Sequence, residues 1–97
     1  MLALDKGLLS AQAHLEIGRL HFDAKDDEGA LSEFLKVAVL YADDDAVCEA
    51  LVLAGQVLEA QGKRDEAAKQ YREASEKHPR ARYAAEAARR LAALAPR

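Results

Sequence analysis

The chain repeats itself at an interval of 37 residues, and this repeat constrains its fold more than any other feature. When the sequence is shifted by 37 positions against itself, small residues fall on small residues and large apolar residues on large apolar ones. The matched pairs include Ala13 with Ala50, Gly18 with Gly55, Ala30 with Ala67, Leu20 with Val57 and Phe34 with Tyr71. A period of this length is typical of proteins built from stacked copies of one supersecondary unit.

The composition indicates that the repeated unit is helical. The chain has 97 residues, of which 51% are hydrophobic, and it contains neither Thr nor Asn. Ala, Leu, Glu, Arg and Lys dominate, and these residues favour helices, whereas the residues that favour strands are scarce. We therefore expect a single all-α domain.

Local signals divide each unit into two helices. Asp26 and Asp27, and then Asp43 to Asp45, can cap the helices that follow them, since carboxylates accept the free N–H groups of a first turn. Gly62 is a typical residue just past a helix, and Pro79 cannot continue one. The expected helices are Ala11–Lys25 with Ser10 as its N-cap, Glu28–Ala42, Ala46–Gln61, Asp65–Lys77 and Ala81–Ala95.

Apolar residues recur at helical spacing within the first unit. The first helix carries Leu15, Ile17, Leu20 and Phe22 on its expected apolar face. The stripe of the second helix consists of Ala30, Leu31, Phe34, Leu35, Ala38 and Val39. We expect both sets to face the core.

The second unit resembles the tetratricopeptide repeat (TPR) family. The matching residues are Leu51, Ala54, Gly55, Leu58, Gly62, Ala67, Tyr71, Ala74 and Pro79. The resemblance implies small residues where two helices cross and an aromatic Tyr71 filling the gap between units. It also implies a right-handed α-solenoid of five helices in one domain, 1–97. Its parts are a leader (1–10), unit one (11–45), unit two (46–79) and a capping helix (80–97).

The first unit matches the family less closely. Gly18, Ala30 and Phe34 fit, whereas His14 and His21 stand where bulky aromatic or apolar residues are usual. The period is 37 residues rather than 34, and we expect the extra residues to lengthen the second helix and the corner at 43–45. The longer unit is similar to repeats of bacterial cell-envelope and Tol-Pal-associated proteins.

The resemblance implies a protein-binding groove along the first helices of the units. Its residues would be Gln12, Leu15, Arg19, Phe22, Glu49, Val52, Gln56, Glu59, Glu86 and Arg89. The groove would take a peptide or a partner helix, with Leu15 and Val52 among its apolar anchors. Both stand where the chaperone-binding branch has Lys, which argues against binding of chaperone tails. Alternatively, Leu15 and Val52 pack against a further helix.

The residue types give no indication of catalysis, of a cofactor or of a metal site. Ser10, Ser32 and Ser75 lie in ordinary helical sequence without a base and an orienting group nearby. His14 and His21 are separated by two helical turns, roughly 10 Å, which is too far for both to bind one zinc ion. Cys48 lies at the edge of an apolar stripe, and we expect a buried thiol.

Charge is distributed unevenly along the chain. Residues 1–60 hold four basic and twelve acidic groups, a net charge of −8, whereas residues 61–97 hold ten basic and five acidic groups, a net charge of +5. The basic tail, residues 80–97, has Tyr83 as its one aromatic, too few for a nucleic-acid stacking platform. No signal peptide or membrane-spanning segment is recognisable, so the compartment stays open between cytoplasm and periplasm.

Two further interpretations compete with the groove. In one, the chain associates with itself. The ends of the repeat array are open, with Leu91 and Leu94 on the last helix, and the two ends carry charges of opposite sign. In the other, the chain is a structural spacer excised from a longer repeat protein. No partner can be named from the sequence.

Overall fold

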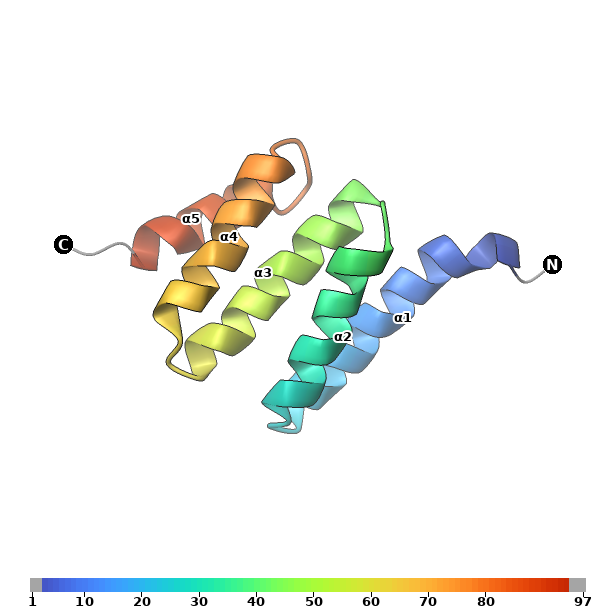
Figure 1. Ribbon diagram of the computed structural model, residues 1–97, viewed down its shortest axis with the longest axis horizontal. Coiled ribbons are helices and arrows are strands. Elements are labelled where there is room, and N and C mark those ends of the chain that lie inside the picture. The colour runs from blue at the N-terminus through green and yellow to red at the C-terminus, as the bar shows by residue number, and fades with distance from the viewer. Residues whose placement is uncertain (1–2, 95–97) are drawn as a thin grey trace.

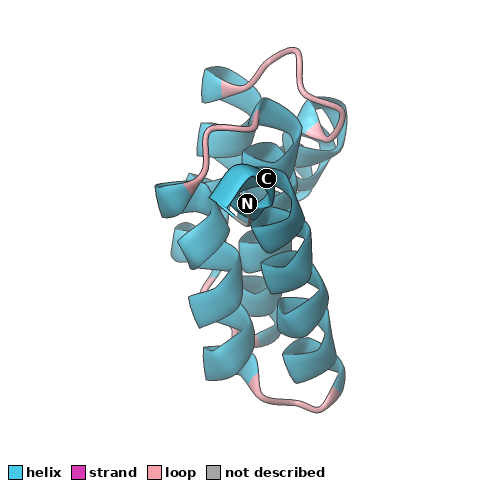
Figure 2. Cartoon of the chain, turned by 90° about the vertical axis from the view of Figure 1, so that its right-hand side faces the viewer, coloured by secondary structure: helices cyan, strands magenta, loops and turns pink. Residues whose placement is uncertain are grey.

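The computed structural model describes the backbone of residues 3–94, and side chains from residue 11 onwards. This part of the chain is all helical and contains no strand. The helices are α1 (Ala3–Asp23), α2 (Asp27–Leu40), α3 (Asp44–Ala60), α4 (Arg64–Lys77) and α5 (Ala84–Leu94). The prediction of an all-α fold is confirmed for these residues. The short loops gather at the two ends of the helices (Figure 2).

The chain forms successive antiparallel helix pairs in an elongated array (Figure 1). Each helix packs against its neighbour in sequence. In addition, α1 contacts α3 and α3 contacts α5, whereas α2 and α4 share no close Cα pair within residues 3–94. The odd-numbered helices therefore lie closer together than the even-numbered ones. We call the side formed by them the α1/α3/α5 face.

Two expectations about helix bounds are wrong. The first helix begins at Ala3 rather than Ala11, and Ser10 is therefore inside a helix rather than its N-cap. The fifth helix begins at Ala84 rather than Ala81, after a turn; the end expected at Ala95 lies outside the described residues. The other ends shift by at most two residues, which is ordinary for helix termini.

The two units close their first helices with the same turn. Gly62 has a φ of +79°, and the N–H of Lys63 donates to the carbonyl of Leu58. At the equivalent place in unit one, Lys25 has a φ of 69°, and the N–H of Asp26 donates to the carbonyl of His21. Gly62 therefore ends its helix as predicted, whereas unit one places a lysine in a conformation that favours glycine.

The aspartates at the two corners act differently. Asp26 caps α2 as predicted, accepting a hydrogen bond from the backbone N–H of Gly29 at 3.1 Å. Asp43 makes no side-chain cap bond to α3. Instead, Asp44 contacts His78 at 2.5 Å, and Asp45 accepts from the backbone N–H of Arg82 at 2.8 Å. These carboxylates thus tie the 78–83 turn to the start of α3.

The helices of the array differ in length. The second helices of the two units, α2 and α4, have 14 residues each, whereas α3 has 17. The expectation that the extra residues of the repeat lengthen the second helix and the 43–45 corner stays a prediction. Ten residues of α3 are buried, because helices on both sides pack against it.

The core consists of two clusters that share α3. One cluster joins α1, α2 and α3 and contains Leu15, Phe34, Val37 and Val57 with several alanines. The other joins α3, α4 and α5 and contains Leu51, Val52, Leu58 and Tyr71. Because α3 supplies residues to both clusters, it is the central helix of the molecule.

Each unit packs an aromatic ring directly on a glycine. A Cβ atom placed on Gly18 would lie 2.4 Å from Cε1 of Phe34, and one on Gly55 would lie 2.4 Å from Cε1 of Tyr71. Both rings are fully buried. The expected small residues at the helix crossings are confirmed, but Tyr71 packs first within its own unit rather than only between units.

Candidate functional site

The predicted binding residues lie on α1, α3 and α5, several of them at equivalent positions of successive helices. Gln12, Glu49 and Glu86 occupy one position of the repeat, and Arg19 and Gln56 occupy another. Gln12, Arg19, Glu59 and Arg89 are exposed, whereas Phe22, Glu49, Gln56 and Glu86 are half-buried. Eight of the ten predicted residues are thus at least partly accessible.

The two predicted apolar anchors are not available to a partner. Leu15 is 1% exposed and Val52 is 2% exposed. Leu15 belongs to the cluster of α1, α2 and α3, and Val52 to that of α3, α4 and α5. The prediction that they line a groove is therefore wrong, and the alternative, packing against a further helix, is correct. The stacking of the odd-numbered helices places these side chains between them.

Several of the accessible predicted residues form hydrogen bonds or ion pairs within the chain. Arg19 of α1 forms an ion pair with Glu49 of α3. Glu86 accepts from Nε of Arg90 at 2.8 Å within α5. Burial opposes a charged guanidinium, but the hydrogen bond and charge of Glu86 raise the pKa of Arg90. The face is consequently a polar surface with charges of both signs.

Glu59 and Phe22 occupy equivalent positions but behave differently. Glu59 accepts a hydrogen bond from the hydroxyl of Tyr71 at 2.6 Å. Burial, followed by this bond to a carboxylate, raises the pKa of Tyr71 well above its ordinary value. In unit one the ring is Phe34, which has no hydroxyl, and half-buried Phe22 packs against the cluster that contains it. Each residue complements the aromatic ring of its own unit.

Histidines in the structure pair with carboxylates rather than with one another. Nδ1 of His14 lies 2.6 Å from Glu33, and Nδ1 of His21 lies 2.9 Å from Asp26. Burial would raise the pKa of Glu33, but hydrogen bonds from His14 and Lys36 outweigh it and lower that pKa. Among the described residues, no three His, Cys, Asp or Glu side chains gather closely enough to hold a metal ion.

Cys48 is a buried thiol, as predicted. Its side chain is fully buried, and Sγ lies 3.7 Å from the carbonyl oxygen of Ala74, to which it donates. Burial, assisted by the negative charge of Asp44, raises the pKa of the thiol to about 11. A thiol with this pKa is a weak nucleophile at neutral pH, because the thiolate is the reactive form.

The sequence analysis missed the apolar surface of unit one. Five large hydrophobic residues of the described region are exposed: Ile17 42%, Leu20 66%, Leu35 37%, Val39 78% and Leu40 67%. Four of them, Ile17, Leu20, Leu35 and Val39, were expected to face the core, and this expectation is wrong. All five belong to unit one.

Comparison with unit two separates these residues into two groups. The equivalents of Ile17 and Leu20 are Ala54 and Val57, which are buried against α2. Ile17 and Leu20 therefore mark the open end of the array, on α1. The equivalents of Leu35, Val39 and Leu40 are Arg72, Glu76 and Lys77, which are exposed. The charged residues found 37 positions later in the sequence were therefore a signal that Leu35, Val39 and Leu40 face solvent.

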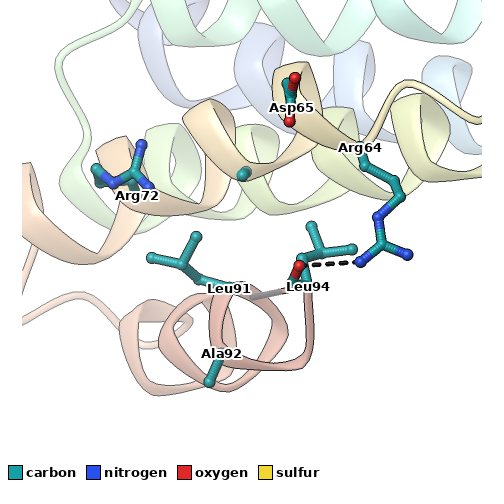
Figure 3. A pocket seen from close by; sticks show the side chains of 7 residues that line it. Arg64, Asp65, Arg72, Leu91, Ala92 and Leu94 are labelled. Atoms are coloured by element: carbon teal, nitrogen blue, oxygen red, sulfur yellow. Dashed lines mark hydrogen bonds between the residues drawn. The ribbon is translucent and has the colours of Figure 1, made fainter. Parts of the chain in front are cut away.

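A cavity of about 310 Å³ lies between α4 and α5. Leu91 and Leu94 point from α5 toward α4, and Arg64 and Arg72 of α4 lie on either side of them (Figure 3). Arg64 donates to the backbone carbonyl of Leu94 at 2.9 Å, so that it holds the end of α5. No predicted site residue lines this cavity.

None of the helices in residues 3–94 combines the length and the hydropathy that crossing a membrane requires. In comparisons with known proteins, no family model matches the chain, and neither a curated protein nor a solved structure matches it.

Proposed function

We propose that this chain is a non-catalytic protein-interaction module of the tetratricopeptide type, a right-handed solenoid of two helical hairpins and a capping helix. The repeated Gly–aromatic contacts and the equivalent turns at Lys25 and Gly62 support this assignment. Stacked units of this kind present extended surfaces to partner chains. The inference from fold to function is by analogy.

The observation that carries the proposal is the row arrangement of polar residues on the α1/α3/α5 face. Gln12, Glu49 and Glu86 repeat along it, and exposed arginines stand at Arg19 and Arg89. Because Leu15 and Val52 are buried, the partner is a peptide or helix held by hydrogen bonds and charges rather than by apolar anchors. Such contacts fix register and orientation more than they supply affinity.

A phage-displayed library of random peptides tests this proposal. We expect the selected peptides to share polar and charged positions, and their binding to perturb NMR signals of α1, α3 and α5. The variant Gln56→Ala/Arg89→Ala should weaken that binding, while the matched pair Lys69→Ala/Glu73→Ala on α4 should not. Selection of no peptide, or equal binding by both variants, would refute the groove.

Self-association is the second candidate function, and a specific observation favours it. Ile17 and Leu20 form an exposed apolar end on α1 at positions that are covered in unit two. The net charges of −8 on residues 1–60 and +5 on residues 61–97 favour contact between unlike ends of two chains. The third interpretation, a structural spacer, has no such supporting observation.

A further inference from the structure

Two surfaces of the molecule lie outside the α1/α3/α5 face. The first, which we call the α2 patch, consists of Leu35, Val39 and Leu40 on the outer side of α2. The second, the α4/α5 groove, is the cavity whose apolar lining includes Ala68, Leu91 and Leu94, with Arg64 and Arg72 at its rim (Figure 3). One surface projects apolar side chains, and the other is a hollow with an apolar floor.

The α2 patch is not required by the packing of the repeat. Its equivalents on α4 are Arg72, Glu76 and Lys77, and α4 packs against its neighbours with these charged residues in solvent. Val39 is 78% exposed and Leu40 is 67% exposed, so neither contributes much to the core. Adjacent large apolar residues on a surface are typical of an interaction site.

The α4/α5 groove follows from one difference between the units. Ala68 of α4 is equivalent to Leu31 of α2, and Leu31 is half-buried and packs against the cluster of α3, α4 and α5. The short side chain of Ala68 leaves space at the same position. A volume of about 310 Å³ is at the lower end of the range for ligand pockets, so it suits a few aliphatic side chains.

The two surfaces also differ in charge. Lys36 beside the α2 patch is paired with Glu33, and exposed Glu28 and Asp43 stand near the two ends of α2. Around the groove, Arg64 and Arg72 outnumber Asp65. The net charges of the two parts of the chain differ in the same direction. The patch lies within residues 1–60, which have a net charge of −8, and the α4 residues of the groove lie within residues 61–97, which have a net charge of +5. Unlike charges around complementary apolar surfaces favour their association.

We propose that the α2 patch of one chain docks in the α4/α5 groove of a second copy. This inference goes beyond the proposed function, because both surfaces lie outside the α1/α3/α5 face. The contact is heterologous, since each chain uses a different surface, so assembly continues from chain to chain or closes into a ring. It leaves the α1/α3/α5 face free for a peptide.

Sedimentation velocity over a hundredfold range of concentration tests the proposal. The variant L35R/V39E/L40K gives α2 the residues that α4 carries, and Ala68→Leu gives α4 the residue that α2 carries. We expect the wild type to assemble, more weakly at high salt because exposed charges are screened. Each variant should raise the dissociation constant of the assembly by at least about tenfold. The dissociation constant is obtained from the dependence of sedimentation on concentration.

A mixture of the two variants tests directly whether the patch of one chain binds the groove of another. The patch variant retains its groove and the groove variant retains its patch, so together they should form a complex of one chain of each. Contact between two α2 patches would leave Ala68→Leu self-associating, and docking of an unrelated partner would leave the wild type monomeric. Either result overturns the proposal, as does a mixture that forms no complex.

Circular dichroism shows whether each variant is folded. Should Ala68→Leu fail to fold, Arg72→Glu serves as the groove variant, because Arg72 is exposed and its reversal removes the charge complementarity. The peptide-binding assay on the same variants separates the two proposals. A monomeric wild type that binds selected peptides refutes only the docking, whereas an assembling wild type that binds none refutes only the groove.

Discussion

Unit one and unit two share one contact at the centre of their interiors and differ most on their exteriors. Phe34 on Gly18 and Tyr71 on Gly55 place a ring on a glycine in the same geometry. On the outside, Leu35, Val39 and Leu40 face solvent where unit two has Arg72, Glu76 and Lys77. The comparison teaches that packing fixes the inner positions of a repeat, while its outer positions are open to selection for other purposes.

The largest expected effect tests whether the interiors are equivalent. We expect Gly18→Ala and Gly55→Ala to destabilise the fold, because each new Cβ would overlap a buried ring. Overpacking costs about 1–3 kcal/mol, which exceeds the gain in helix propensity of roughly 1 kcal/mol. Urea unfolding should give similar losses for the two variants. A large loss in one unit alone would show that the two interiors differ.

The turns after α1 and α3 allow a smaller test of equivalence. Lys25 occupies the left-handed region that Gly62 occupies in unit two. Lys25→Gly should therefore stabilise the fold by about 1 kcal/mol, and Gly62→Lys should destabilise it by a similar amount. For a domain of this size, thermal melting should shift by roughly 4–8 °C in opposite directions. Equal signs would contradict the shared turn.

The smallest effect is a dependence on pH that belongs to unit one. The pair of His14 and Glu33 lies 2.6 Å apart, whereas the equivalent residues of unit two are Leu51 and Gln70. Because the pKa of Glu33 is lowered in the folded state, its contribution is present above the ordinary pKa of 4.5 and is lost as the pH falls through the lowered value.

Hydrogen exchange at decreasing pH should measure this difference. We expect amides of α1 and α2 to lose protection before those of α4, after correction for the intrinsic pH dependence of exchange. Glu33→Gln, which copies unit two, should remove that part of the acid response. If the variant leaves the acid response of α1 and α2 unchanged, the His14–Glu33 contact does not control it.

Periodicity and turn residues were sufficient to predict five helices, apart from the starts of α1 and α5, and the small residues where helices cross. Gly62 and Asp26 act as their residue types indicate, because these signals depend on local backbone geometry. The exposed state of Leu35 and Val39 was not predictable from their own helix, since apolar residues at three- and four-residue spacing ordinarily face a core. It depends on which neighbouring helices cover each side of α2.

The candidate binding face was only partly predictable for the same reason. Equivalent positions predict that Gln12, Glu49 and Glu86 share one surface, and all three are at least partly accessible. Leu15 and Val52 share that register but are buried, because the odd-numbered helices approach closely enough to enclose them. The distance between stacked helices is a tertiary property that the spacing of residues does not specify.

The central claim is that the α2 patch is a surface for interaction and has no part in holding the fold together. Urea unfolding of L35R/V39E/L40K, at a concentration where the wild type is monomeric, tests it most directly. We expect the free energy of unfolding to stay within about 0.5 kcal/mol per substitution of the wild-type value, as for ordinary surface changes. A loss of several kcal/mol would show that these side chains stabilise the fold and would contradict the claim.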